Sequence, residues 1–534
     1  MNKTLYNKLK NRFGKISDKE YEYDEYEAIS HYFRNTYNED EYHIDDITWN
    51  DLDMDSIYMI INNCCSSVGR DYLYKLLRIP TNKQDILDER ERLIQYFDAH
   101  EDERTKIMMA LCKMGYTRKI SISDYMKNIF SLKPGSNVIH IFTNLFLIAS
   151  LVYMIFADAV VGVFFLLVSA GISIVSYYKY KAKIVNYFVC IKQLVSMLDA
   201  AKDISKLDIN ELSEYNKSFN ELNKHFAKVS HNSFLLVTSS DNNGSLIEVF
   251  MEYFRMFTHV DLIKFNNMIK HLENSYDEVI KLMDMLGLMD SMISIANFRR
   301  AIPYYCVPQF INNKNMELNE VYHLSIKKPV PNSINESKPV LLTGSNASGK
   351  STFLKSVAIS AVLAQSINTC PSKSYVAPFY RVYSSMALRD SIESGESYYI
   401  VEIKSLKRIM DKAAQVGDTI LCFVDEVLRG TNTVERIAAS SQILKELWNQ
   451  NVMCFAATHD IELSYILQDY YSNYHFTEQV VDNEIHFSYD LLKGRATSRN
   501  AIKLLEIIGY DKAVVDKAAS RAQEFVNTGV WRQI

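Results

Sequence analysis

The chain has 534 residues and a formal net charge of −5 at pH 7. This length exceeds what one compact core accommodates, so we expect several structural units. The mildly acidic balance excludes a protein whose bulk charge attracts nucleic acid, although it does not exclude a local basic patch. Glycine (16) and proline (9) are scarce, which favours long helices.

Cysteine usage and the N-terminus indicate a reduced compartment. The eight cysteines include the adjacent pair Cys64 and Cys65, but no C-x-x-C spacing occurs. Buried, reduced thiols are therefore favoured over disulfides or a zinc site. The first ten residues are polar and basic with no apolar stretch behind them, so we expect no cleavable signal peptide.

The first 136 residues divide into two regions. Residues 1–45 are acidic and rich in tyrosine, which predicts a solvated helix or a partly ordered arm; a docking segment for a basic partner is the alternative. Residues 46–136 carry apolar residues at helical spacing, such as Leu52, Ile57 and Ile61. They are predicted to form the first half of a helical core and lever region.

Residues 137–178 form an apolar hairpin. Two charge-free runs, 138–156 and 160–176, flank a turn at Asp158, and lysines lie on both outer sides. Each run approaches the roughly 20 residues that span a bilayer. The lysines predict that both ends are cytoplasmic and that only the turn lies outside. A hairpin buried in a soluble core is the alternative, but such a hairpin should show polar faces at helical spacing.

The pattern changes again after the hairpin. Residues 179–305 return to amphipathic helix and are predicted to form the second half of the lever region. Residues 306–534 alternate strands with helices, which is typical of an α/β domain with a largely parallel sheet. The predicted fold is therefore multidomain, mainly α-helical, with a C-terminal α/β domain and a two-helix transmembrane hairpin.

A glycine-framed loop lies between an apolar run at 340–342 and a predicted helix. Its pattern is G-x-x-x-x-G-K-[ST], a phosphate-binding P-loop. The glycines let backbone N–H groups turn toward an anion, the helix adds its positive end, and the lysine supplies a charge. The serine after the lysine can ligate Mg²⁺. The predicted nucleotide-binding residues are Gly344, Ser345, Asn346, Ala347, Ser348, Gly349, Lys350, Ser351 and Thr352.

Two further buried strands end in chemically useful side chains. The run 419–424 ends in Asp425 and Glu426, and the run 452–457 is followed by Thr458 and His459. Asp425 would join Ser351 in holding Mg²⁺, and Glu426 would orient the attacking water. An acidic helix cap is the alternative for the carboxylates. His459 would sense the γ-phosphate, although a lone histidine is often structural.

Together these motifs resemble the MutS family, the ABC-type ATPases known from DNA mismatch repair. The resemblance is carried by the stretches 343–352 (T-G-S-N-A-S-G-K-S-T), 425–433 (D-E-V-L-R-G-T-N-T), 458–459 (T-H), 494–498 (G-R-A-T-S) and 394–398 (S-G-E-S-Y). A weaker likeness extends over about 46–130 and 245–520.

The resemblance implies ATP hydrolysis with ATP and Mg²⁺ in a head-to-tail dimer. Lys350, Glu426 and His459 would be the catalytic residues. It also implies that Ser397 reaches the γ-phosphate held by the other subunit, that Asn332 lies near the base, and that His475 stacks on adenine. The chain departs from the family at Pro329-Val330, where an aromatic residue often precedes the asparagine.

We therefore expect a homodimeric MutS-like ATPase anchored in the cytoplasmic membrane, with its ATPase domain in the cytoplasm and helical levers that transmit closure. The 45 residues ahead of the helical core are too few for a mismatch-reading domain, so we do not expect a mismatch sensor. The alternatives are a cytoplasmic DNA-binding clamp ATPase and a scaffold that binds ATP but scarcely hydrolyses it. An unknown protein partner is compatible with each.

Overall fold

The computed structural model describes two compact units. The helical unit comprises Met1–Glu39, Ile61–Leu76 and Arg92–Ala301, and the sheet unit comprises Asp40–Ile60, Leu77–Glu91 and Ile302–Ile534. The segments expected as 1–45 and 46–136 are thus each divided between the two units. The residues described are 3–17, 19–117, 119, 121–133, 135–229, 246–345, 348–386, 398–415, 417, 419–481, 484–496, 501–531 and 533.

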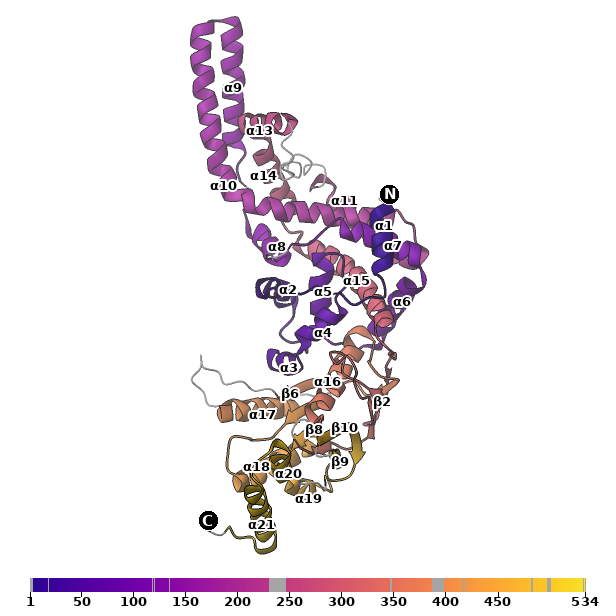
Figure 1. Ribbon diagram of the computed structural model, residues 1–534. Coiled ribbons are helices and arrows are strands. Elements are labelled where there is room, and N and C mark those ends of the chain that lie inside the picture. The colour runs from indigo at the N-terminus through magenta and orange to yellow at the C-terminus, as the bar shows by residue number, and fades with distance from the viewer. Residues whose placement is uncertain are drawn as a thin grey trace. The chain divides into compact units, whose positions relative to one another are not determined.

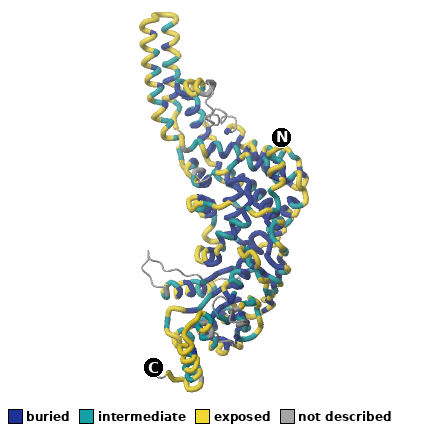
Figure 2. Tube along the Cα trace, viewed as in Figure 1, coloured by how far each residue is buried: buried dark blue, intermediate teal, exposed yellow. Residues whose placement is uncertain are grey.

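The helical unit is organised around one long buried helix, α15 (Tyr276–Ala301), which Figure 2 shows within the dark-blue core. The segment 1–45 contributes α1 and α2, and α2 buries Ile29 and Tyr32 completely, so its inner face belongs to the core. Besides the two helices of the apolar hairpin, this unit also includes all or part of α5 (Ser67–Arg78), α6 (Gln84–Ala99), α7 (Glu101–Cys112), α8 (Ile122–Ser131), α11 (Ser213–His225), α13 (Leu246–Thr258) and α14 (Val260–Leu272), with α1 (Lys3–Arg12) and α2 (Tyr23–Thr36).

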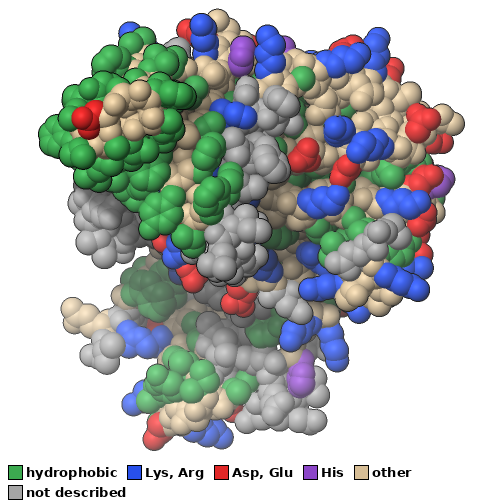
Figure 3. All heavy atoms as spheres, turned by 90° about the horizontal axis from the view of Figure 1, so that it is seen from above, with side chains coloured by type: hydrophobic (Ala, Val, Ile, Leu, Met, Phe, Trp, Pro, Cys, Tyr) green, Lys and Arg blue, Asp and Glu red, His purple; other side chains and the backbone are tan. Residues whose placement is uncertain are grey.

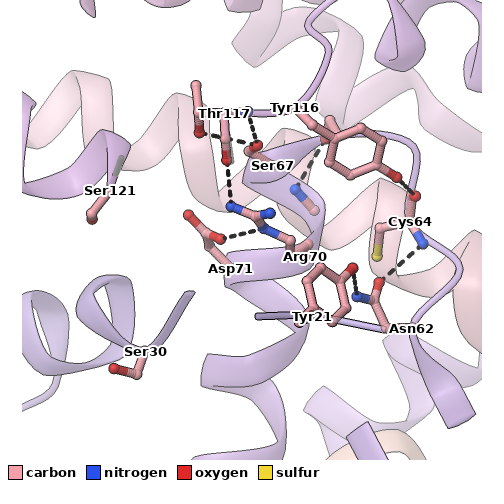
Figure 4. A network of polar contacts seen from close by, with 12 residues as sticks. Tyr21, Ser30, Asn62, Cys64, Ser67, Arg70, Asp71, Tyr116, Thr117 and Ser121 are labelled. Carbon is pink, nitrogen blue, oxygen red and sulfur yellow. Dashed lines mark hydrogen bonds and ion pairs between the residues drawn. The ribbon is translucent and has the colours of Figure 1, made fainter. Parts of the chain in front are cut away.

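A buried polar network joins distant segments of this unit (Figure 4). Arg70 Nε donates to Asp71 at 3.2 Å and its Nη2 donates to the carbonyl of Thr117 at 2.9 Å, while Asn62 donates to the hydroxyl of Tyr21 at 2.7 Å. Burial raises the pKa of Asp71 to about 6. Asp71 pairs the buried charge of Arg70, which would be costly alone, and the bonds from Arg70 to Thr117 and from Asn62 to Tyr21 connect the distant segments.

The apolar hairpin consists of α9 (Val138–Phe156) and the start of α10 (Ala159–Ser205), drawn at the top of Figure 1. Both segments are long and apolar enough to cross a membrane, by length and composition, and only 17% of each is buried in the protein. A Cβ added to Gly162 would lie 2.3 Å from Met154 Cα, so glycine permits the close contact between the helices. Large side chains such as Phe142 and Leu167 face outward, so the described residues do not bury the hairpin.

The sheet unit contains two sheets. The six-stranded sheet has the order β10-β9-β4-β8-β7-β6 and is parallel except for the β9–β10 pair, as the sequence predicts for an α/β domain. The four-stranded sheet has the order β1-β5-β2-β3. The strands are β1 (Gln309–Phe310), β2 (Met316–Val321), β3 (Asn332–Glu336), β4 (Val340–Thr343), β5 (Ser374–Ala377), β6 (Arg381–Ser385), β7 (Ile420–Asp425), β8 (Met453–Thr458), β9 (Ser472–Val481) and β10 (Glu484–Lys493).

Helices cover the six-stranded sheet, and a segment from early in the chain protects its edge. The helices that contact this sheet are α3 (Asp46–Asp51), α16 (Lys350–Ile367), α17 (Tyr398–Gln415), α18 (Thr433–Asn449) and α19 (Ile461–Ile466). The unit also contains most of α4 (Met54–Ile61), and α20 (Ala501–Ile508) and α21 (Lys512–Thr528), which pack on each other. The Asp51 carboxylate accepts from Ser384 Oγ at 2.7 Å and from Met386 N at 2.8 Å. Side chains of α3 therefore satisfy polar groups of edge strand β6, which would otherwise be open to pairing.

Gly69→Ala should destabilise the helical unit. The added Cβ would lie 2.1 Å from Asp290 Oδ2, and that carboxylate accepts from the backbone N of both Cys65 and Ser66 at 2.9 Å. Moving it should cost about 1–3 kcal/mol and lower the melting temperature by about 2–4 °C per kcal/mol. In the control Gly171→Ala, the new Cβ meets no described atom within 4 Å. Equal melting temperatures for the two variants would contradict the prediction.

Candidate functional site

The register of three parallel strands brings three turns to one edge of the sheet. Thr343 at the end of β4 lies opposite Thr458 at the end of β8, and Ala457 of β8 lies opposite Asp425 at the end of β7. The loop after β4, the residues after β7 and His459 after β8 therefore meet where parallel strands present their carboxyl ends.

The phosphate-binding loop has the backbone that its glycines permit. Gly344 and Gly349 have φ of 146° and 108°, a region that side chains disfavour. Lys350 is 5% exposed, and its Nζ donates to the carbonyls of Gly344 and Ser345 at 2.8 and 2.7 Å. Burial lowers the pKa of Lys350. Ser345, Ser348, Ser351 and Thr352 line the adjoining cavity; Asn346 and Ala347 lie outside the described residues.

Ser351 and Asp425 form a pair of hard oxygen ligands. The Ser351 hydroxyl donates to the Asp425 carboxylate, and burial raises the pKa of Asp425. Hydroxyl and carboxylate oxygens beside a phosphate cradle fit Mg²⁺, which prefers oxygen and keeps several ligands from water and substrate. The described residues contain no cluster of three or more His, Cys, Asp or Glu side chains suited to a metal. Oxygens of water and substrate would complete the coordination of a bound Mg²⁺.

Glu426 is held in one orientation by two nitrogen-bearing side chains. Its carboxylate lies 2.7 Å from His459 Nε2 and 2.9 Å from Arg429 Nε. The hydrogen bond from His459, with the nearby positive charges, lowers the pKa of Glu426, so the group is ionised. Its φ of 58° is unusual for a side-chain-bearing residue and is maintained by the surrounding turn. In that turn the buried Glu402 accepts from the backbone N of Leu428.

The cavity beside these groups has a volume of about 520 Å³, within the range of small-molecule sites. Polar phosphate-loop residues line one part. The remainder includes the side chains Val321, His323, Ile326, Lys328, Pro329, Val330, Asn332, Phe476 and Tyr489. One cavity thus combines anion-binding groups with an apolar compartment large enough for a flat ring.

The structure gives different outcomes for the three residues that the family resemblance places around the nucleotide. Asn332 lines the cavity, but its side chain bonds the backbone of β10: Oδ1 accepts from Leu491 N at 2.7 Å and Nδ2 donates to Tyr489 O at 3.0 Å. His475 lies 3.1 Å from the carbonyl of Gly494, and the described residues that line the cavity do not include it. Ser397 lies outside the described residues.

Sequence reasoning missed Tyr489, an aromatic residue that lines the same cavity as the phosphate loop. The pairing of β9 and β10 is irregular between Phe487 and Leu491, and Tyr489 has a φ of 58°. This bulge directs the tyrosine to the cavity, 3.2 Å from a Cβ built on Gly349. An alternating strand pattern contains no signal of such a bulge.

Comparison with known proteins finds similarity over part of the sheet unit. Residues 340–526 match the family model described as MutS domain V. The chain is 30% identical to the DNA mismatch repair protein MutS of Pseudothermotoga lettingae over 252 residues, 45% of this chain and 30% of that protein. It is 28% identical to human MutS protein homolog 4 over 315 residues, 52% of this chain and 32% of that protein.

The matched residues include the phosphate-loop side of the site, whereas Asn332 and the neighbouring cavity residues from Val321 to Val330 lie outside the match. The phosphate loop, Asp425, Glu426, His459 and Tyr489 all lie within 340–526. The chain spans about a third of the length of these relatives. Residues 340–526 are thus similar to MutS domain V, and about half of the chain is similar to MutS proteins.

Proposed function

We propose that the protein is a homodimeric ATP hydrolase anchored in the cytoplasmic membrane, with its sheet unit in the cytoplasm. The proposed ATP hydrolysis rests on one observation. Four side chains line one cavity of about 520 Å³: Lys350, Ser351, Asp425 and Glu426. MutS domain V belongs to a family of ATPases, which supports the same reaction here.

The residues divide the reaction between them. Lys350 exchanges the carbonyls of the loop for phosphate oxygens and neutralises their charge. Ser351 and Asp425 would hold Mg²⁺, which would supply charge to polarise the terminal phosphate. The ionised Glu426 accepts a hydrogen bond from the attacking water and orients it, while His459 and Arg429 keep the carboxylate in place.

The dimer is part of the proposal because members of the MutS family act as dimers. In a head-to-tail pair, the loop containing Ser397 would reach the γ-phosphate held by the partner. Closure around ATP would then pass to the levers as a change between two arrangements.

The membrane anchor is supported by the exposed surface of α9 and α10. Two apolar helices joined at Asp158 expose large side chains along most of their length. Soluble proteins rarely expose contiguous apolar surface of this size without a partner. Lysines at 127, 133, 179, 181 and 183 flank the hairpin and support a cytoplasmic position for both of its ends.

Lys350→Ala and Glu426→Gln should both abolish steady-state ATP turnover, by at least about 10²–10⁴-fold, the usual contribution of a positioned acid or base. Glu426→Gln should still retain ATP, because the glutamine leaves the loop and the metal ligands intact. Phosphate release and filter-bound nucleotide measure the two effects. Asp516→Asn, an exposed carboxylate on α21, is the control. Full turnover by Glu426→Gln would exclude the proposed mechanism.

Tyr489→Ala should weaken ATP binding by about 1–3 kcal/mol, the usual worth of a base stacked on an aromatic ring, while Tyr489→Phe should bind normally. His475→Ala should change the dissociation constant little, because that side chain faces Gly494. Calorimetric titration with a non-hydrolysable ATP analogue distinguishes the two positions. If His475→Ala weakened ATP binding and Tyr489→Ala did not, His475 would be the residue that stacks on adenine, as the family resemblance implies.

The full chain should float with lipid vesicles and resist extraction by high salt. Ile148→Lys combined with Leu167→Lys should move it to the aqueous fraction, because each lysine at mid-bilayer costs about 2.5–3.5 kcal/mol. Both side chains are exposed, so the substitutions remove little internal packing. A wild-type chain that stays aqueous would exclude the anchor. Salt-sensitive binding of that aqueous chain to duplex DNA would favour the clamp instead.

A further inference from the structure

Helix α13 (Leu246–Thr258) presents an aromatic face to the outside. Val249, Phe250, Tyr253 and Phe254 are 49%, 69%, 57% and 44% exposed, and their spacing places them on one side of the helix. Its inner side packs on α10 through Met256, which lies in a buried cluster with Tyr177 and Leu262. The helix is thus amphipathic with its aromatic side uncovered by the described residues.

Hydrogen bonds fix α13 at a defined height on the hairpin. Ser173 Oγ of α10 donates to the carbonyl of Phe257 at 3.0 Å, and Asn144 Nδ2 of α9 donates to the carbonyl of Thr258 at 2.6 Å. His259 Nε2 lies 2.9 Å from the carbonyl of Ser173. Figure 1 shows α13 lying crosswise beside the hairpin. An amphipathic helix crosswise to a membrane-spanning pair has the orientation of a helix in the plane of the bilayer surface.

The length of the hairpin beyond this attachment is short for a bilayer. At 1.5 Å per residue, the rise from Asn144 to Asp158 is about 21 Å and that from Ser173 back to Asp158 about 22 Å. The hydrocarbon core is about 30 Å thick, so this section falls short by about 8 Å. Interfacial helices immerse their apolar face by about 5–10 Å. The hairpin therefore reaches the far side if α13 is itself immersed in the near boundary.

The charges around α13 suit the headgroup region of an anionic leaflet. Lys179 and Lys183 are exposed on α10 just beyond Ser173, on the side away from the Asp158 turn. Lys181 Nζ donates to the Tyr177 hydroxyl at 2.9 Å and lies 3.9 Å from Glu252 of α13. Tyrosine and lysine at this level are typical of the membrane–water boundary. Figure 3 shows the hairpin end from above, where hydrophobic side chains gather.

We propose that α13 is an interfacial helix whose Val249, Phe250, Tyr253 and Phe254 insert at the headgroup–acyl boundary of the cytoplasmic leaflet, while Lys179 and Lys183 contact lipid phosphates. The inference rests on the proposed membrane anchor and deepens it, because it sets the depth at which the hairpin sits. The helical unit then meets the membrane through three helices, which restricts its tilt.

Tyr253→Trp in the full chain tests the depth of α13. The protein is reconstituted into vesicles of phosphatidylethanolamine and phosphatidylglycerol that carry bromine at either a shallow or a deep acyl position, and flotation is recorded on the same sample. Shallow bromine should remove most of the added fluorescence, and deep bromine much less. Tyr510→Trp is the matched control because Tyr510 is 55% exposed in the sheet unit, and its added fluorescence should remain.

The outcomes separate this inference from the anchor itself. Flotation without quenching of the tryptophan introduced at position 253 would overturn the interfacial helix and leave the anchor standing, with a protein partner then covering the aromatic face. Stronger quenching by deep bromine would also overturn the inference, because α13 would then lie within the hydrocarbon core. Failure to float would overturn both.

Discussion

The parallel register of β4, β8 and β7 is the constraint on which the site depends. The cation and the metal ligand of the phosphate loop, the two carboxylates and the histidine come from three turns far apart in the chain, and only the pairing of Thr343 with Thr458 and of Ala457 with Asp425 places them together. The three strands are buried almost completely. A one-residue slip would turn every side chain of the slipped strand against the opposite buried layer, so packing on both faces of the sheet enforces the geometry of the site.

The polar groups of the site are already paired with one another. Lys350 bonds carbonyls of its own loop, Ser345 donates to Glu478, and Glu426 is held by His459 and Arg429. Nucleotide binding therefore exchanges these internal bonds for bonds to phosphate, and only the difference contributes to affinity. The pairing also keeps the buried Lys350 satisfied while the site is open, which a charge in that position requires.

The phosphate loop and the two strand-end motifs could be predicted from the sequence because their chemistry depends on short spacings and on apolar runs that precede them. Tyr489 could not, since its position comes from a bulge in β10 that residue types do not encode. The same holds for Asp51: its role at β6 depends on a segment some 330 residues away in the chain, as the bond to Ser384 shows. The sequence predicts the hairpin as two apolar helices, but it does not predict that α13 is attached to this hairpin.

The few polar residues of the hairpin are unevenly distributed along its length, and their hydrogen bonds explain this distribution. Thr143 and Ser150 bond carbonyls of their own helix, whereas His140, Asn144 and Ser173 contact the turn between α13 and α14. Leaving a polar group without a hydrogen bond in hydrocarbon costs several kcal/mol of free energy. Each of these residues is therefore tolerated only where it has a hydrogen-bond partner. The partnered positions lie toward the lysine end, and the stretch near Asp158 is almost wholly apolar. The sequence of the hairpin therefore follows its surroundings: polar where protein packs against it, apolar where lipid would.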